Sequence, residues 1–243
     1  LFGPDEANPG SPILSHCNMK MQGSPIQGLG HADLIDAVDG SWWMICLGYR
    51  THGYLQHVMG RETFLAPVEW KDGDWPVVNG DGTLQLEMDV TTLPEVKVAG
   101  EPSYEDFSCE TLPIHWSYLC NPDSTKYSFS ERPGYLRLKA SEVNIDDTAS
   151  PTFVARRQTE YNFSATAEID FSNLKNGSQA GLTAYAAAHY HYDVEVRARG
   201  RKHYIAANIR IDNSDNTVVE IPVKTRKAFL RITGNRNGYI LQY

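Results

Sequence analysis

The sequence has little of what marks several protein classes. No stretch is apolar enough over sufficient length to span a bilayer, and residues 1–4 lack the basic start and apolar run of a signal peptide. Positive charge is in deficit, with 22 Lys and Arg against 30 Asp and Glu, which gives a net charge of -8. This balance disfavours nucleic acid and anionic membranes as partners and agrees with a neutral ligand.

Cysteine is also scarce, and the spacing of the cysteines excludes a C-x-x-C metal site. The four are Cys17, Cys46, Cys109 and Cys120. Cys46 lies in an apolar run, so we expect a small buried side chain. Cys109 and Cys120 would pair only if their strands are neighbours, and the sequence leaves this open. Asn162 and Asn176 fit the glycosylation sequon, which matters only if the source is eukaryotic.

Turn-forming and aromatic residues are abundant, with Gly 19, Pro 13 and Tyr 13 in the composition. Residues 30–90 contain short apolar and aromatic runs separated by turn residues, as at Asp39-Gly40 and Asp72-Gly73. Such runs are typical of antiparallel strands joined by hairpins. We expect the four tryptophans of residues 42–75 to pack in a core or between sheets rather than to stack on a ligand.

From Tyr104 onward the pattern becomes regular alternation of apolar and polar residues. Period two places one set of side chains inward and the other in solvent, and several short strands of this kind indicate a β-sandwich. No capped amphipathic helix is evident. The polar connector between Leu93 and Pro102 divides the chain into residues 1–98 and 99–243. The alternating runs cover residues 135–139, 165–171, 194–199 and 205–211.

Several ordered motifs carry a family resemblance. Gly30-His31-Ala32-Asp33, Trp42-Trp43-Met44 and residues 60–64 resemble the last part of the catalytic five-bladed β-propeller of family 43 glycoside hydrolases. Residues 131–138 and 150–158 resemble the C-terminal concanavalin-like β-sandwich, a jelly roll, of the β-xylosidase and α-L-arabinofuranosidase branch. The resemblance implies an all-β chain in which both domains are incomplete, the sandwich being truncated at its C-terminal end.

The implied activity is the removal of terminal xylose or arabinose from xylan-derived oligosaccharides by inverting hydrolysis, with no cofactor required. The family uses an aspartate base, a glutamate acid and a second aspartate, all on earlier blades. We therefore expect the acid and base upstream of this chain and no catalytic residue within it. Asp33 is expected to be structural, Asp36 and Asp39 to belong to a turn, and Glu62 to support Arg61 or a backbone amide.

We favour a secreted or periplasmic location over the cytoplasm.

The resemblance assigns active-site support to two residues. His31 would lie at the propeller centre and hold a water or a metal ion, or else be a buried histidine bonded to a backbone carbonyl. Both interpretations bury it. Arg61 would reach the substrate and the catalytic carboxylates, because a guanidinium offers a planar fork of donors. Its alternative is a surface ion pair with Glu62 or Glu69.

A structural calcium ion is a further implication. Related sandwiches hold calcium through carboxylates, and Asp106 and Glu131 are the candidates, although calcium takes about six to eight oxygens. His189 and His191 suggest a metal or sugar patch, but without a third ligand we expect an exposed sheet face.

Two other functions stay open at this level. In the first, the chain is a non-catalytic carbohydrate-binding or scaffold module. In the second, it is a complementing subunit of a split enzyme, and a partner chain carries the missing blades. In every case the expected ligand is a xylo- or arabino-oligosaccharide, and self-association would cover the apolar faces of an incomplete propeller.

Overall fold

The structure is a computed structural model that describes residues 5–53, 55–90 and 92–243. It divides into two compact units, Leu1–Ala99 and Gly100–Tyr243. The described residues form strands, turns and two short 3-10 helices, η1 (Met19–Met21) and η2 (Ser124–Lys126), without any α-helix. The expected all-β fold is therefore confirmed.

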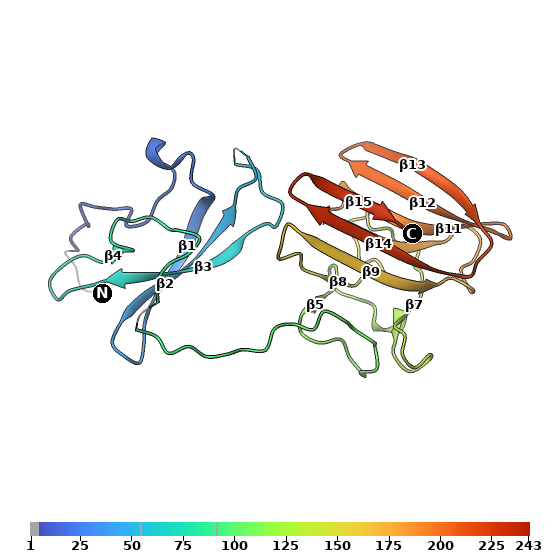
Figure 1. The fold of residues 1–243 in the computed structure, drawn as a ribbon, viewed down its shortest axis with the longest axis horizontal. Coiled ribbons are helices and arrows are strands. Elements are labelled where there is room, and N and C mark those ends of the chain that lie inside the picture. Colours follow the sequence, from blue (N-terminus) through green and yellow to red (C-terminus); the bar gives the residue numbers. More distant parts are fainter. Residues whose placement is uncertain (1–4, 54, 91) are drawn as a thin grey trace. The chain divides into compact units, whose positions relative to one another are not determined.

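The first unit is built on one antiparallel sheet with the order β1-β2-β3-β4 (Figure 1). A tight turn, in which Ala37 N donates to Ser41 O at 2.8 Å, joins β1 to β2, while longer connections lead from β2 to β3 and from β3 to β4. A four-stranded antiparallel sheet is the form of a single propeller blade. The strands are β1 (Ile26–Asp36), β2 (Trp42–Arg50), β3 (Glu62–Glu69) and β4 (Val77–Val78).

The core of this unit lies on one face of the blade. Period-two alternation directs Met44 of β2 and Ala66 of β3 to the same side, and the two residues are paired across the strands. His16, 2% exposed, joins the flanking segments to this core. Its Nδ1–H donates to Ile26 O at 2.7 Å, and its Nε2 accepts from Leu84 N–H at 2.9 Å. The buried core residues are Ile26, Met44, Cys46, Ala66, Val68, Val78 and Leu84.

The tryptophans of the blade differ in burial. Trp43 is only 5% exposed, whereas Trp70 and Trp75 are 43% and 42% exposed. Trp42 is half-buried and its ring lies 4.9 Å from that of Trp70. Trp43 is therefore buried, on the face of β2 opposite to Met44, whereas Trp70 and Trp75, which follow the end of β3, are not buried.

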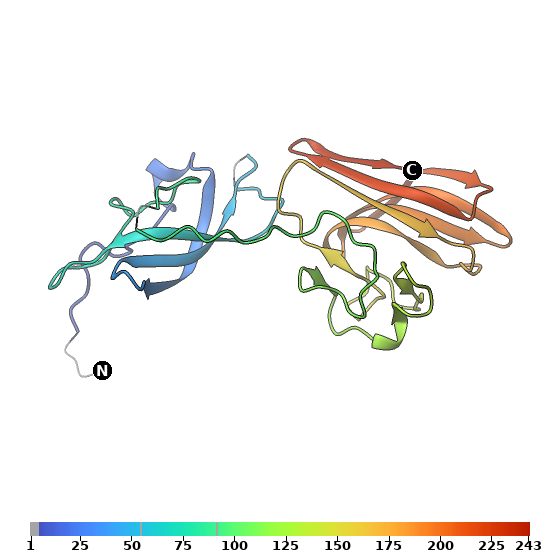
Figure 2. The same ribbon diagram turned by 60° about the horizontal axis from the view of Figure 1, so that its bottom comes forward.

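The second unit is a β-sandwich of two antiparallel sheets, with the orders β10-β11-β12-β13 and β15-β14-β9 (Figures 1 and 2). Val194 and Val196 of β11 meet Leu230 and Ile232 of β14 in the core between the sheets. The strands are β9 (Phe163–Asp170), β10 (Gln179–Ala187), β11 (Tyr190–Arg199), β12 (Lys202–Ile211), β13 (Ser214–Val223), β14 (Lys227–Asn235) and β15 (Gly238–Gln242).

Residues 100–160 precede the sandwich strands and contain only two-residue strands. The expected strand at residues 135–139 shortens to β7, because Tyr135 N donates to Arg132 O and closes a turn there. The Tyr127 hydroxyl accepts from Phe153 N at 3.0 Å and ties this region together. The pairs are β5 (Trp116–Ser117) with β8 (Ala155–Arg156), and β6 (Tyr127–Ser128) with β7 (Arg137–Leu138).

Candidate functional site

His31 is exposed on this blade, whereas both sequence-based interpretations bury it, the first of them at the centre of a propeller whose other blades this chain does not contain. The register of β1 against β2 shifts on both sides of Gly30, and His31 has a φ of 51°. A bulge of this kind takes a residue out of the regular ladder and re-aims its side chain. In this chain the bulge therefore turns His31 away from the blade core.

Arg61 is also exposed and immediately precedes β3. Gly30 is paired with Leu47, and Leu47 with Thr63, so these three residues form one row across the blade. His31 and Arg61 each lie within two residues of this row. Neighbouring strands are about 4.8 Å apart, which puts β1 and β3, on the two sides of β2, roughly 10 Å from each other. The two predicted residues therefore lie on the two sides of β2, His31 in the middle of β1 and Arg61 immediately before β3.

Glu62 has a partner that the sequence analysis did not name. The Arg50 guanidinium donates to both of its carboxylate oxygens, from Nε to Oε2 at 3.0 Å and from Nη2 to Oε1 at 2.8 Å. The two side chains are 27% and 22% exposed, and Arg50 Nη2 also lies 3.4 Å from Met59 Sδ. The expectation that Glu62 supports Arg61 or a backbone amide did not include this ion pair with Arg50. Sequence reasoning missed Arg50, although a hairpin places the end of β2 beside the start of β3.

The other carboxylates of the blade have structural surroundings. Asp39 Oδ1 accepts from Ser41 Oγ at 2.6 Å and from Ser41 N at 3.0 Å, closing the β1–β2 turn. These bonds, the hydroxyl first, hold the pKa of Asp39 below its ordinary value. Asp33 and Asp36 lie exposed on β1. A glycosidase general acid needs a raised pKa, so Asp39 has the opposite environment.

Asp106 and Glu131 do not fit a calcium ion as they are arranged. Asp106 is exposed and caps a turn, accepting from Ser108 N at 2.9 Å. Glu131 binds Lys139 Nζ at 2.9 Å and Arg137 Nε at 3.5 Å, so two cations already neutralise it. Calcium takes about six to eight oxygens. The described part of the chain contains no group of three or more residues suited to a metal ion.

All four cysteines are free, so Cys109 and Cys120 do not form a disulfide in this structure. Cys46 is 2% exposed within the blade core, and burial raises the pKa of its thiol. It is therefore the small buried side chain that its apolar neighbours predicted.

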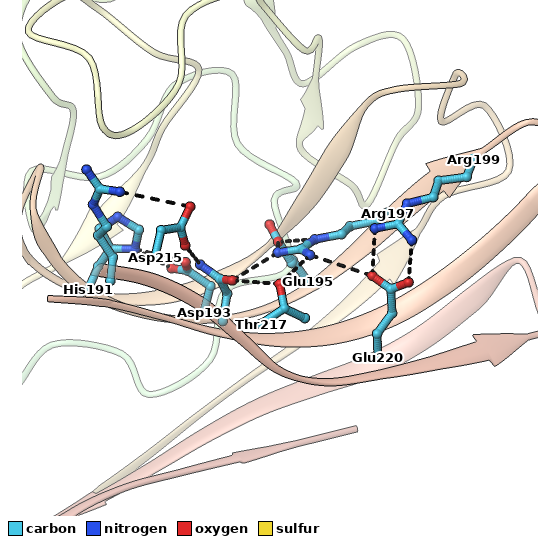
Figure 3. A network of polar contacts seen from close by, with 10 residues as sticks. His191, Asp193, Glu195, Arg197, Arg199, Asp215, Thr217 and Glu220 are labelled. Carbon is cyan, nitrogen blue, oxygen red and sulfur yellow. Dashed lines mark hydrogen bonds and ion pairs between the residues drawn. The ribbon is translucent and has the colours of Figure 1, made fainter. Parts of the chain in front are cut away.

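The densest polar arrangement lies on the outer face of the four-stranded sheet of the sandwich (Figure 3). Val194 and Val196 face the core, so the alternate residues of β11 face outward. Three of these, His191, Asp193 and Glu195, are nevertheless only 4%, 6% and 8% exposed. The predicted exposed face is therefore wrong for His191. Its cover comes from Asp146, which is far away in the sequence.

Arg197 donates hydrogen bonds to three side chains of this outer face. Its Nε donates to Glu195 Oε1 at 2.7 Å, and its Nη1 and Nη2 donate to Thr217 Oγ1 and Asn208 Oδ1 at 2.8 and 3.2 Å. Burial raises the pKa of Glu195 even though the Arg197 charge opposes that rise. Every other residue from His191 to Arg197 is polar or charged, and this alternation is the sequence signal that could have identified the network.

The Arg132-Pro133-Gly134-Tyr135 motif has a structural role in the sandwich. Arg132 forms an ion pair with Asp170 of β9 and lies 3.8 Å above the Tyr135 ring. Lys227 donates to the Tyr135 hydroxyl at 3.0 Å and to Glu168 at 3.1 Å. These contacts attach the motif to the three-stranded sheet, and they explain why those residue types occur together.

Comparison with known proteins assigns both units. Residues 1–76 match the model of glycosyl hydrolases family 43, and residues 104–243 match the β-xylosidase C-terminal concanavalin A-like domain. A non-reducing end α-L-arabinofuranosidase of Bacteroides ovatus is 38% identical over 99% of this chain. A β-xylosidase of Bacillus subtilis is 28% identical over the whole chain. This chain covers 45% and 48% of the two relatives, so it spans less than half of their length.

A solved structure agrees with these matches. The family 43 protein BlXynB from Bacillus licheniformis has a TM-score of 0.90 and 31% identity, with 100% of this chain and 47% of that protein covered. The shared fold, the two domain matches and the ordered motifs have one explanation. The chain belongs to glycosyl hydrolase family 43, and its second unit is the concanavalin A-like domain of that family's β-xylosidases.

Proposed function

We propose that this chain is the C-terminal part of an inverting glycosidase that releases terminal xylose or arabinose from xylan-derived oligosaccharides. The observation that carries this proposal is the match of two family 43 domains, in order, within one chain. The two relatives that this chain matches over nearly all its length are named an arabinofuranosidase and a xylosidase, so a terminal pentose is the substrate class. This membership favours a glycosidase over a separate carbohydrate-binding or scaffold module.

The catalytic acid and base of this enzyme would come from the propeller blades that this chain does not contain. Inverting hydrolysis needs two carboxyl groups about 6.5–9.5 Å apart, one of them protonated. In the blade, Glu62 is held by Arg50 and Asp39 closes a turn. The carboxyl groups with raised pKa values, Asp193 and Glu195, are less than 10% exposed and lie on the sandwich. Neither set offers a solvent-accessible acid and base.

The chain would contribute support to the active site through His31 and Arg61. Both side chains are exposed, His31 in the middle of β1 and Arg61 immediately before β3, where further residues can meet them. The Arg61 fork suits a sugar hydroxyl pair or a carboxylate. The ion pair between Arg50 and Glu62 stiffens the adjoining strand ends. A side chain that binds sugar hydroxyls needs such preorganisation, because hydrogen-bond donors that are misplaced lose much of their effect.

We further propose a secreted or periplasmic location, where polysaccharide fragments are met. The described residues include no helix that is both long and apolar enough to cross a membrane.

The proposal is tested on a longer protein that carries the remaining blades. It should hydrolyse nitrophenyl xyloside or arabinofuranoside, and NMR of the first sugar released should show the inverted anomer. In that protein Arg61→Lys should lower kcat/KM about tenfold or more, because lysine cannot reproduce the planar fork. Lys71→Arg, in an exposed turn, is the matched control and should leave kcat/KM unchanged. Retention of configuration, or equal kinetics for both variants, would contradict the assignment.

A further inference from the structure

His191 is held between two carboxylates. Its Nδ1 lies 2.8 Å from Asp193 Oδ2, and its Nε2 lies 2.7 Å from Asp146 Oδ1. The His191 side chain is 3% exposed, and that of Asp193 is 9% exposed. Asp193 is on the same strand, whereas Asp146 comes from the segment that precedes the sandwich strands. The ring therefore joins that segment to the outer face of the sheet.

This geometry requires two protons among three groups. Both ring nitrogens face a carboxylate, and a carboxylate without its proton can only accept a hydrogen bond. A neutral imidazole has one N–H, so its other nitrogen would turn a lone pair toward a carboxylate oxygen. The conflict disappears if the ring carries both protons or if Asp193 keeps its own. Burial raises the pKa of Asp193, which favours retention of the second proton.

The remaining neighbours of His191 do not supply that proton. Tyr185 of β10 stacks on the ring, with centroids 5.9 Å apart and planes 19° from parallel. Arg210 of β12 is the cross-strand partner of His191, and its guanidinium lies 4.0 Å from Asp215 of β13 and 3.3 Å from His189. The nearby Thr183 hydroxyl lowers the pKa of Asp193, although less than burial raises it, while its own Oγ1 stays without a hydrogen-bond partner among the described residues.

Two hydrogen bonds join residues 141–147 to this face. One is the bond from His191 to Asp146, and the other runs from the Tyr185 hydroxyl to Ile145 O at 3.4 Å. The first is shorter and joins ionisable groups, and such bonds are roughly twice as strong as neutral ones. Within the segment, Asn144 N donates to Asp147 Oδ2 at 2.7 Å, which keeps the turn itself intact. The attachment of the segment thus depends mainly on the second proton.

We propose that Asp146, His191 and Asp193 form a proton-dependent latch that holds residues 141–147 on the outer face of β10 and β11. At pH 6 the three groups share two protons and the latch is closed. When the pH rises and one proton leaves, the remaining ring proton stays on Nδ1 beside the more deeply buried Asp193, so Nε2 turns a lone pair toward the Asp146 carboxylate and the segment opens. The closed form binds a proton that the open form releases, so its stability falls as the pH rises.

Hydrogen exchange of the complete 243-residue chain tests the latch. After correction for base-catalysed intrinsic exchange, the opening of residues 141–147 should increase about tenfold between pH 6 and pH 9, because the open form releases a proton that the closed form binds. Residues 202–211 of β12 serve as the internal reference and should not change. Equal opening of residues 141–147 at both pH values overturns the proposal.

Asp146→Asn makes the test specific. The amide can donate to one ring nitrogen while the other donates to Asp193, so a neutral ring is satisfied. This variant should therefore open equally at pH 6 and pH 9, within about twofold, whereas Glu142→Gln, at an exposed neighbour, should keep the tenfold dependence of the wild type. Persistence of that dependence in Asp146→Asn contradicts the latch.

A measurement on the unaltered chain covers the case in which the variant fails to fold. Nitrogen-15 NMR of the His191 ring at pH 6 should show protons on both nitrogens, or a carboxylic-acid proton on Asp193 bonded to Nδ1. A ring with a single proton beside two ionised carboxylates at pH 6 overturns the proposal.

Discussion

At the scale of single residues, two histidines of the blade have roles that the sequence did not separate. The buried histidine bonded to a backbone carbonyl, which was an alternative for His31, is in fact His16. The bonds to Ile26 O and Leu84 N hold the segments before β1 and after β4 on the blade. His16 stands in a Pro- and Gly-rich stretch without periodicity, so no local pattern indicated that it would be buried.

His16→Ala should lower the free energy of unfolding of the first unit by about 2–5 kcal/mol, because it leaves a buried carbonyl and a buried N–H without partners. His31→Ala, at an exposed position, should change it by less than about 0.5 kcal/mol. Guanidinium unfolding followed by tryptophan fluorescence reports this unit, because Trp42, Trp43, Trp70 and Trp75 lie in it. Equal stabilities for the two variants would show that the His16 bonds contribute nothing.

The residues that sequence reasoning missed share a physical feature. Arg50 meets Glu62 across a hairpin, and His191 meets Asp146 from a segment outside the sheet. Local alternation identifies which residues leave the core, but it does not say what covers them. Burial by a segment 45 positions away was therefore not accessible from the pattern of β11.

At the scale of elements, the close approach of β10 to β11 depends on one glycine. Gly181 is paired with Glu195, and a Cβ built on it would lie 2.2 Å from Val194 O and 2.5 Å from Glu195 Cα. Both contacts are to backbone, so the strands would have to move apart.

Gly181→Ala should destabilise the sandwich by about 1–3 kcal/mol, the usual loss for overpacking. Gly100→Ala, where a Cβ meets nothing within 4 Å, is the control. Thermal unfolding followed by circular dichroism should show a Tm several degrees lower for the first variant and an unchanged Tm for the second. An unchanged Tm for Gly181→Ala would mean that the two strands are free to separate locally.

The attachment of the Arg132 motif to β9 makes the sandwich sensitive to acid. Hydrogen bonds from Ser172 and then from Arg132 hold the pKa of Asp170 well below its ordinary value. A depressed pKa adds stability above the ordinary value of about 4, and this stability is lost as the pH falls through the folded-state value. Asp170→Asn should therefore be less stable than the wild type at pH 7, and the difference should shrink toward pH 2.

Urea unfolding at several pH values measures this difference, with Glu160→Gln as an exposed control. A gap between Asp170→Asn and the wild type that stays constant from pH 7 to pH 2 would argue against an ionic contribution from Asp170.

Period-two alternation located the central strands of the sandwich correctly. The runs at residues 165–171, 194–199 and 205–211 correspond to β9, β11 and β12. β13 went unrecognised because its first residues, Ser214-Asp215-Asn216-Thr217, are all polar and show no alternation. β7 is shorter than expected because a turn precedes it. Alternation therefore identifies strands with one buried face better than polar edge strands.

At the scale of the whole molecule, the chain combines a blade and a sandwich that each have their own core. The resemblance to family 43 predicts both folds and their order from the sequence alone, because ordered motifs over most of a chain are specific. The arrangement of ionisable groups does not follow from motifs. It depends on register, bulges and distant covering segments, as His31, Glu62 and His191 show.

The central claim is that this chain carries the supporting part of a family 43 glycosidase and lacks its acid and base. The most direct measurement is the release of nitrophenol from nitrophenyl xyloside and arabinofuranoside by the purified chain alone. Without general acid and base help, each typically worth about 10²–10⁴-fold, the rate should equal that of buffer. Turnover that follows the protein through purification and disappears in Asp33→Asn or Glu62→Gln would contradict the account.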